Sequence, residues 1–262
     1  MRSTEEFFSK NLVFTLAAFV AAGAPNRSAT VAYRHLNYFV RVGRLKRVRS
    51  GLYAVVPAGV APETYIPDPY LVAWAVGRGA PLGYHTALEL LGVGHSVFRT
   101  KMVLTDRRAA AFDFDGHRVE FAPPPPRLRT RGDTELGVTT LRYLTAELKI
   151  TGRERTLVDC LLHPSRAGGL EEVLNSVNGF GVLDLSALEE YLLALGSRRA
   201  WATTGYYLEK RQTHLFVPEH VLEQLAAQRP KSRQYWLAGQ RGGRLASRWN
   251  LIVPAMARDI LG

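Results

Sequence analysis

Apolar residues in the segment 26–57 recur first at helical spacing and then in two shorter segments around a turn. They first recur every three to four residues, which predicts a helix that starts at an Asn26 or Ser28 cap and ends at Gly43. Two further segments, one basic and one apolar, flank the turn pair Ser50-Gly51 and predict a short hairpin. A helix followed by a basic hairpin is the layout of a winged helix-turn-helix.

The two sides of this predicted helix differ in chemistry. At about 100° per residue, Ala32, Leu36 and Phe39 fall on one side, and hydrogen-bonding and cationic side chains fall on the other. Phosphates attract Lys and Arg whatever the base sequence, whereas Arg, Asn and Thr can tell base edges apart in the major groove. A charge run is often only a solvated face. This one coincides with a helix, a turn and a hairpin in the order that DNA-binding units show.

We therefore expect double-stranded DNA as a partner of this region. Arg34 and Asn37 are assigned to the groove. Five further cations are assigned to phosphates: Arg41, Arg44, Lys46, Arg47 and Arg49. The candidate contacts at the helix start are Arg27, Ser28 and Thr30.

The rest of the chain mixes helical and strand patterns. Residues 5–22 supply apolar bulk to support the predicted recognition helix, and Thr15 is a candidate helix cap. Prolines in the Ala- and Gly-rich residues 57–69 mark a domain boundary. We expect an α+β protein with a winged helix DNA-binding domain at residues 1–60 and a larger mixed α+β domain at residues 61–262.

Helices are expected where apolar residues recur at helical spacing, and strands where they alternate or cluster. The expected helices cover residues 70–76, 84–91, 151–163, 169–177, 186–196 and 218–228. The expected strands cover residues 100–105, 111–115, 117–122, 139–143 and 148–150. Asp115-Gly116 predicts a hairpin turn. Thr151 with Glu154, and Ser186 with Glu189, predict capping boxes at two helix starts.

Charge is concentrated at the two ends of the 262-residue chain. The formal net charge is +11, and 47% of the residues are hydrophobic, enough to build one large core or two ordinary ones. Residues 1–60 hold 9 Lys/Arg and 2 Asp/Glu, and residues 229–262 hold 7 and 1, whereas the middle is nearly balanced. A polyanion is thus the expected partner of the N-terminal region, and the basic C-terminal end is a second candidate for DNA contact.

An apolar run near the N-terminus imitates a signal peptide. It covers residues 12–24, but Glu5 and Glu6 offset the positive charges before it, and it falls short of the ~20 residues that span a bilayer. We expect a core helix here, no membrane segment and a cytoplasmic protein. The single cysteine, Cys160, excludes a disulfide framework and suits a reducing compartment.

Two sets of acidic residues imitate enzyme sites. Asp133 with Glu147 and Lys149 resembles the acid layout by which some nucleases hold a divalent metal. Such letters arise by chance in many chains, and Glu147 is expected where a turn leads into a strand. Asp113 and Asp115 resemble a nucleotidyltransferase acid pair, but no Gly-Ser precedes them and the expected hairpin turn explains Asp115.

Two single residues also invite a catalytic interpretation. His85 and Cys160 both lie in apolar helical patterns, where packed side chains are the commoner case. No phosphate-cradling glycine loop is present. We therefore expect no catalytic residue, no metal and no cofactor, and a protein that is not an enzyme.

Several short motifs together resemble the AbiEi antitoxin family of bacterial abortive-infection toxin–antitoxin systems. They follow one another along most of the chain: Gly43-Arg44-Leu45, Arg49-Ser50-Gly51-Leu52-Tyr53, Tyr84-His85-Thr86-Ala87-Leu88, Glu154-Arg155-Thr156-Leu157-Val158-Asp159, Gly168-Gly169 and Gly205-Tyr206-Tyr207-Leu208-Glu209. The wing motif occurs in many regulators, so the order of the pieces carries the resemblance.

The resemblance implies an N-terminal winged helix that binds inverted repeats in its own promoter and represses the operon. It also implies that the larger domain neutralises a nucleotidyltransferase-like toxin encoded alongside, as a functional partner without a stable complex. A free-standing winged helix regulator, whose larger domain dimerises or binds a small ligand, is the alternative. Sequence alone does not separate the two, because the neighbouring gene distinguishes them.

Overall fold

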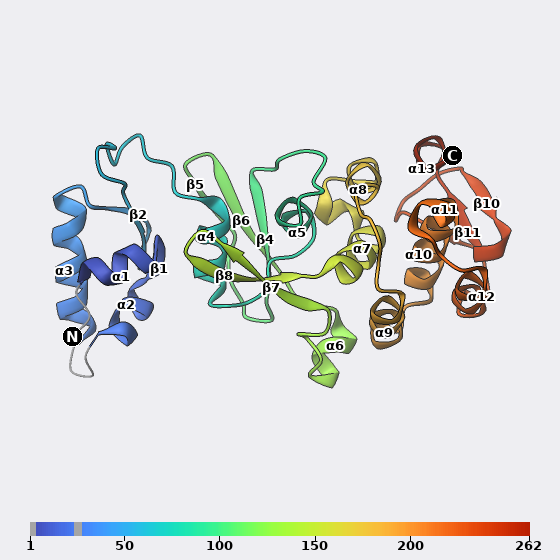
Figure 1. The fold of residues 1–262 in the computed structure, drawn as a ribbon, viewed down its shortest axis with the longest axis horizontal. Coiled ribbons are helices and arrows are strands. Elements are labelled where there is room, and N and C mark those ends of the chain that lie inside the picture. Colours follow the sequence, from blue (N-terminus) through green and yellow to red (C-terminus); the bar gives the residue numbers. More distant parts are fainter. Residues whose placement is uncertain (1–3, 24–27) are drawn as a thin grey trace. The chain divides into compact units, whose positions relative to one another are not determined.

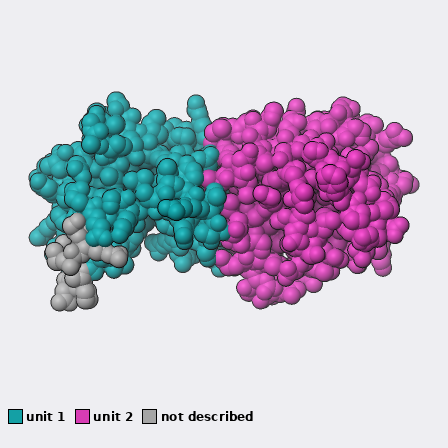
Figure 2. Space-filling view, viewed as in Figure 1, with its two compact units in different colours: residues 1–82, 99–122, 140–149 teal, residues 83–98, 123–139, 150–262 magenta. Residues whose placement is uncertain are grey.

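The computed structural model describes residues 4–23 and 28–262 and has a mixed α+β fold (Figure 1). It divides into two compact units, coloured separately in Figure 2. Unit 1 comprises residues 1–82, 99–122 and 140–149, and unit 2 comprises residues 83–98, 123–139 and 150–262, each taken over its described residues. The domain boundary that we predict near residue 60 stays a prediction.

The N-terminal part of unit 1 combines three helices with a small antiparallel sheet. The helices are α1 (Thr4–Lys10), α2 (Leu16–Ala22) and α3 (Ala29–Arg41). The strands are β1 (Val13–Thr15), β2 (Leu45–Arg49) and β3 (Leu52–Val55), in the sheet order β1-β3-β2. The expected helix and hairpin are therefore present, with Ser50-Gly51 at the tip between β2 and β3.

The expected helix caps in this region are confirmed where the structure describes them. The Thr15 side chain accepts a hydrogen bond from the Ala18 amide at 3.1 Å at the start of α2. The Ser28 side chain does the same for the Val31 amide at 3.3 Å at the start of α3. Gly43 follows α3 with a φ of +76°, which favours glycine. The alternative cap Asn26 lies outside the described residues.

Aromatic packing positions α3. Phe8, Phe14 and Phe19 form a core cluster with Leu36 and Tyr53, and the rings of Phe8 and Phe14 stack with centroids 5.6 Å apart. The expectation that residues 5–22 support this helix is confirmed. Because α3 is packed along one side only, its other side is free to carry polar groups.

The remainder of unit 1 is built on a second sheet. Helix α4 (Pro69–Gly77) packs against this three-stranded sheet, which contains β4 (Thr100–Leu104), β5 (Phe112–Phe114) and β6 (His117–Ala122) in the order β4-β6-β5. Strands β4 and β6 are parallel, and β5 and β6 form an antiparallel hairpin. Its turn, Asp115-Gly116, has positive φ at both residues (42° and 79°), as the sequence predicts. A separate two-stranded ribbon contains β7 (Val138–Tyr143) and β8 (Ala146–Thr151), and its residues 140–149 belong to unit 1.

Unit 2 is mainly helical. Its α-helices are α5 (His85–Leu90), α6 (Pro126–Arg131), α7 (Arg153–Leu162), α8 (Leu170–Val177), α9 (Leu185–Leu195), α10 (Arg198–Lys210), α11 (Gln212–Leu215), α12 (Glu219–Ala227) and α13 (Ala255–Leu261). Two 3-10 turns, η1 (Pro164–Ala167) and η2 (Ser247–Trp249), and a small sheet complete it. The sheet contains β9 (Gln234–Tyr235), β10 (Arg244–Ala246) and β11 (Leu251–Val253) in the order β10-β11-β9. Helix α6 begins at Pro126, the last of four consecutive prolines, and a proline fits the first turn of a helix.

Both expected capping boxes are wrong. Helix α7 is capped by Gly152 without a side-chain hydrogen bond, and the Glu154 carboxylate instead accepts a hydrogen bond from the Asp184 amide at 2.9 Å. Helix α9 is capped by Asp184, whose carboxylate accepts from the Ser186 and Ala187 amides at 3.0 Å each. The Glu154 carboxylate binds the backbone amide of Asp184 instead of an amide at the start of its own helix. The free amides at the start of α9 bind the Asp184 carboxylate, so Ser186 is not the cap.

The apolar N-terminal run forms short elements. Most of it lies in β1 and α2, a helix of seven residues. Within residues 4–23 and 28–262, no helix has the length and apolar character needed to cross a membrane.

Candidate nucleic-acid interface

The outward side of α3 carries the polar residues that the sequence assigns to DNA. Ala32 and Leu36 are fully buried, which confirms the apolar side, and Phe39 packs against the same core. Thr30, Arg34 and Arg41 are exposed on the other side and Asn37 is partly exposed. We call Thr30, Arg34, Asn37 and Arg41, together with Arg47 of β2, the cationic face.

Arg34 and Arg41 are without ion-pair partners. Neither makes an ion pair or a side-chain hydrogen bond with a residue that the structure describes. Helix α3 itself contains no acidic residue. Two guanidinium groups in water with no carboxylate beside them are available to an external anion at no cost in broken internal contacts.

Arg47 joins the hairpin to α3. Its guanidinium donates a hydrogen bond to Asn37 Oδ1, and its Cζ lies 5.8 Å from the ring centroid of Tyr33. A hydrogen bond with Asn37, and then the positive charge of Arg47, lower the pKa of the exposed Tyr33 hydroxyl. Asn37 therefore interacts with both Arg47 and Tyr33.

The other cations of the hairpin already have partners within unit 1. Arg44 forms an exposed ion pair with Glu5 at 2.6 Å. Lys46 Nζ is 2.8 Å from Asp115 Oδ1 and 2.7 Å from the Tyr65 carbonyl oxygen, and its side chain is only 17% exposed. A phosphate at Lys46 would have to compete with two oxygens.

Arg49, at the end of β2, lies over an aromatic ring rather than beside the cationic face. Its Cζ is 4.5 Å from the centroid of Phe112 in β5. The structure therefore brings Thr30, Arg34, Asn37, Arg41 and Arg47 together and turns Lys46 and Arg49 toward other elements of unit 1. Ser28 is used as the cap of α3, and Arg27 lies outside the described residues.

Unit 2 contains a buried polar cluster around His85. Its Nε2 is 2.9 Å from Glu172 Oε1 and its Nδ1 is 3.3 Å from Glu89 Oε1. The ring of Phe98 stacks on the imidazole at a centroid distance of 3.8 Å, and His85 is 3% exposed. Ser96 also donates to Glu172 from its backbone and its hydroxyl, both at 2.9 Å. The expectation of a packed, hydrogen-bonded histidine is confirmed.

The carboxylate partners of His85 were missed at the level of sequence. Glu89 follows His85 by one helical turn and could have been noticed. Glu172 lies 87 residues away, and only the packing of α8 against α5 brings it to the imidazole.

A second buried cluster joins Arg155 to Asp159, which lies one helical turn further along α7. Arg155 Nε is 3.5 Å from Asp159 Oδ2, and Arg155 is fully buried. Its Nη1 donates to the carbonyl oxygens of Thr134 and Leu136 at 2.8 and 2.7 Å. The Tyr191 hydroxyl donates to Asp159 at 2.6 Å, and burial raises the pKa of the Asp159 carboxyl.

Glycines of the motifs in unit 2 allow close packing. A Cβ at Gly168 would overlap the ring of Phe98, and a Cβ at Gly205 would overlap the ring of Trp249. The nearby Glu209 accepts a hydrogen bond from Trp249 Nε1 at 2.8 Å. In unit 2, the residues that carry the family resemblance therefore include buried ion pairs and tight contacts that hold the helices together.

The acidic residues that imitate enzyme sites have other partners or turn roles. Asp113 pairs with Arg118 at 2.9 Å. Asp115 lies in the turn between β5 and β6 and pairs with Lys46 of β2. Asp133 pairs with Arg131 at 3.0 Å. Over the described ranges there is no group of three or more His, Cys, Asp or Glu residues that could hold a metal ion. Cys160 is fully buried in α7, and burial raises the pKa of its thiol.

The basic C-terminal end is folded into unit 2. Residues 229–262 form the small sheet, η2 and α13. Arg248 pairs with Glu209 at 3.0 Å and with Glu219 at 2.7 Å, so this cation is used within the unit.

Comparisons with known proteins bear on the fold alone. No protein-family model matches the chain, and no curated protein matches it. Among solved structures, the crystal structure of the RV2827C protein from Mycobacterium tuberculosis is similar, with a TM-score of 0.57 and 18% sequence identity. The match covers 97% of this chain and 90% of that chain. At this identity the likeness extends to the arrangement of the elements and carries no function with it.

Proposed function

We propose that this protein is a DNA-binding regulator of the winged helix type and acts as an antitoxin of the AbiEi type. In this proposal it represses its own promoter in the cytoplasm by binding inverted repeats through α3. Its larger domain counters a nucleotidyltransferase-like toxin encoded alongside. Support for the first part comes from the cationic face, and support for the second from the order of the sequence motifs.

The observation that carries the DNA-binding part is the unpaired charge of α3. Arg34 and Arg41 are exposed on the side opposite the buried Ala32 and Leu36, without a carboxylate partner in the described chain. A recognition helix needs this arrangement, because it must pack along one side and present donors along the other. Charges that serve only to contact water could lie anywhere on the surface. Here they coincide with the hydrogen-bonded Asn37 and the hairpin.

The contacts suggest separate roles within the cationic face. We assign Arg34 and Asn37 to base edges, where Arg suits guanine and an amide suits adenine. Arg41 and Arg47 are assigned to phosphates, and Arg47 also positions Asn37 through their hydrogen bond. Arg44, Lys46 and Arg49 contribute less in this arrangement, because each already interacts within unit 1.

DNA binding by the full-length protein tests this assignment. Fluorescence anisotropy would compare the duplex upstream of its own gene with a shuffled duplex over a salt series. We expect Arg34→Ala or Asn37→Ala to cost about 1–3 kcal/mol on the upstream duplex with little effect on the shuffled one. Arg47→Ala should weaken both and flatten the salt slope by about one.

The structure adds a coupling between Asn37 and Arg47. Since Arg47 positions Asn37, the Asn37→Ala/Arg47→Ala double variant should lose less than the sum of the single losses on the upstream duplex. Arg129→Ala, an exposed arginine of α6 in unit 2, is the matched control and should bind like the wild type. Equal losses on both duplexes for Asn37→Ala would show that the groove assignment is wrong.

The antitoxin part requires a separate measurement. Growth would be followed while the adjacent nucleotidyltransferase-like gene is expressed with this protein or without it. Because the proposal assigns repression to α3 and neutralisation to the larger domain, Arg34→Ala/Asn37→Ala should lose repression and still rescue growth. If the wild-type protein does not rescue growth, the antitoxin part of the proposal is wrong and only the regulator part remains.

The free-standing regulator remains the second candidate. The observation that favours it is a pair of arginine-lined pockets in unit 1, which would suit a small anionic ligand. Absence of a nucleotidyltransferase-like gene beside this one, together with specific DNA binding, would make it the better assignment.

A further inference from the structure

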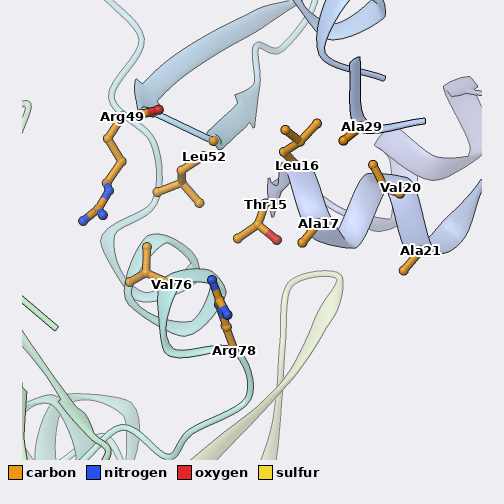
Figure 3. A pocket seen from close by; sticks show the side chains of 12 residues that line it. Thr15, Leu16, Ala17, Val20, Ala21, Ala29, Arg49, Leu52, Val76 and Arg78 are labelled. Carbon is orange, nitrogen blue, oxygen red and sulfur yellow. The ribbon is translucent and has the colours of Figure 1, made fainter. Parts of the chain in front are cut away.

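Two adjoining pockets in unit 1 share the lining residues Arg49, Val76 and Arg78. The first lies among α2, the tip of the β2–β3 hairpin and the end of α4, and has a volume of about 600 Å³ (Figure 3). The second has a volume of about 370 Å³ and extends to residues 105–110, the loop that follows β4. Both volumes lie in the range of small-molecule sites.

The walls of the first pocket are mainly apolar. Leu16, Ala17, Val20 and Ala21 line it from α2, and Leu52 lines it from β3 (Figure 3). The side chain of Arg78 rises toward this space from the end of α4 in the same view. Such a wall suits a flat or aliphatic group of a ligand, and the arginines beside it suit a negatively charged group of the same ligand.

The second pocket concentrates positive charge. Arg49 and Arg78 line it together with Arg107 and Arg108. Among the described residues, no Asp or Glu lines either pocket, and none of the four arginines forms an ion pair. Like charges on side chains that line one pocket repel one another unless an anion lies among them. The charge of this pocket therefore lacks a counterion from the described chain.

Arg78 occupies a backbone conformation that disfavours it. It is the C-cap of α4 with φ +53° and ψ 45°, in the left-handed region that usually holds glycine or asparagine. Strained backbone of this kind tends to occur at functional sites. An arginine at this position places a long cationic side chain where glycine would satisfy the backbone better.

Two other elements of the site are held in place before any ligand arrives. Arg49 rests on the ring of Phe112 with its Cζ 4.5 Å from the centroid. The Arg107 amide donates to Thr105 Oγ1 at 3.2 Å, which fixes the start of the loop. Cations that are already positioned lose less conformational entropy when they bind an anion.

We propose that these two pockets together bind a free nucleotide, with its phosphates among the four arginines and its base against the apolar wall. Guanidinium groups pair with phosphate oxygens through two parallel hydrogen bonds, which a lysine cannot do. The apolar pocket would have no role if the site bound inorganic phosphate alone. The concave shape and volume suit a small molecule rather than a duplex. No residue of the cationic face lines either pocket, so the site is separate from that face.

Calorimetric titration of the full-length protein tests the proposal. The probes are ATP, adenosine and inorganic tripolyphosphate at low ionic strength without DNA. ATP should bind at least tenfold more tightly than either fragment, because only ATP fills both pockets. GTP and CTP would then show whether the apolar wall selects a base.

Variants separate this site from the rest of the molecule. Arg78→Gly removes a cation and relieves the left-handed backbone, so it should weaken ATP binding at least tenfold while the melting temperature stays equal or rises. Arg107→Gln should also weaken ATP binding, and Ala17→Asp should weaken ATP and adenosine binding by adding a charge to the apolar wall. Arg129→Gln, an exposed arginine of unit 2, should leave ATP binding unchanged.

Three outcomes would overturn the proposal. They are no heat of binding for millimolar ATP, equal affinity for ATP and tripolyphosphate, and loss of ATP binding in Arg34→Ala while Arg78→Gly still binds. A loss of DNA affinity in Arg78→Gly with no ATP binding by the wild type would instead assign these arginines to backbone phosphates of DNA. The nucleotide site and the DNA interface can thus fail independently.

Discussion

Arginine has opposite roles in the two units. In unit 1, Arg34 is exposed on α3 without an ion-pair partner among the described residues. In unit 2, Arg155 is fully buried and contacts Asp159 and the carbonyl oxygens of Thr134 and Leu136. Water solvates an exposed cation, whereas a buried cation must have protein partners. The comparison teaches that partners and burial, rather than residue type, separate a binding charge from a structural one.

The sequence motifs contain residues of both kinds. In Gly43-Arg44-Leu45 of unit 1, Arg44 is exposed and pairs with Glu5, whereas Leu45 is buried in the core. In unit 2 the motif residues His85, Arg155 and Gly205 are buried. A motif shared with a family can therefore report how helices pack as well as what the protein binds.

The largest expected effect comes from exchanging each arginine for methionine. Arg155→Met should lower the free energy of unfolding by about 3–5 kcal/mol, since it leaves Asp159 buried without its cation. Arg34→Met, the matched exposed change, should stay within about 0.5 kcal/mol. Urea unfolding followed by circular dichroism would measure both.

In the DNA-binding assay we expect the opposite ranking of the two variants. Arg34→Met should lose affinity for the upstream duplex, and Arg155→Met should keep it under conditions where the variant is folded. Similar stability losses in the two variants would contradict the distinction between binding and structural arginines.

A smaller effect is expected from glycine packing in α10. Gly205→Ala should cost about 1–3 kcal/mol, because the new methyl group overlaps Trp249, even though alanine is the better helix former. Gly181→Ala is the matched control, since nothing lies within 4 Å of a Cβ there and its φ is not positive. Thermal unfolding should show a lower Tm for the first variant only. A Tm unchanged in Gly205→Ala would mean that the Trp249 ring can move aside.

The smallest expected effect is a pH dependence from Glu172. Burial alone would raise the pKa of this carboxyl, but hydrogen bonds from His85 and Ser96 outweigh it and lower the pKa below 4.5. A lowered pKa contributes stability that is fully present above pH 4.5 and is lost as the pH falls through the lower pKa of the folded state.

Glu172→Gln keeps the shape and removes this titration. We expect it to cost about 1 kcal/mol at pH 7 and to flatten the fall in stability below pH 4.5. Unfolding curves between pH 3 and 7 would measure the difference. An identical acid profile in the variant would show that Glu172 does not contribute to the pH dependence.

Much of the N-terminal region could be predicted because its signals are local. The Thr15 and Ser28 caps, the left-handed Gly43 and the Ser50-Gly51 turn each depend on residues within a few positions. The two sides of α3 follow from helical spacing, which a single sequence displays directly.

Long-range partners account for what could not be predicted. Glu154 and Ser186 match the capping pattern, yet an amide 30 residues away recruits Glu154, and Asp184 caps α9. Nothing near Lys46 or Arg49 along the chain indicates that Asp115 and Phe112 would approach them. A side chain that could bind a nearby amide can also bind a distant one in the folded protein, and the more stable hydrogen bond forms.

The sequence by itself determined the α+β composition, the helix and hairpin near the N-terminus and the excess of positive charge there. Only the tertiary structure decided which of those cations remain without ion-pair partners and which arginines line a common pocket. The physical reason is that charge and period belong to single residues and their neighbours along the chain, whereas pairing and burial belong to residues that folding brings together.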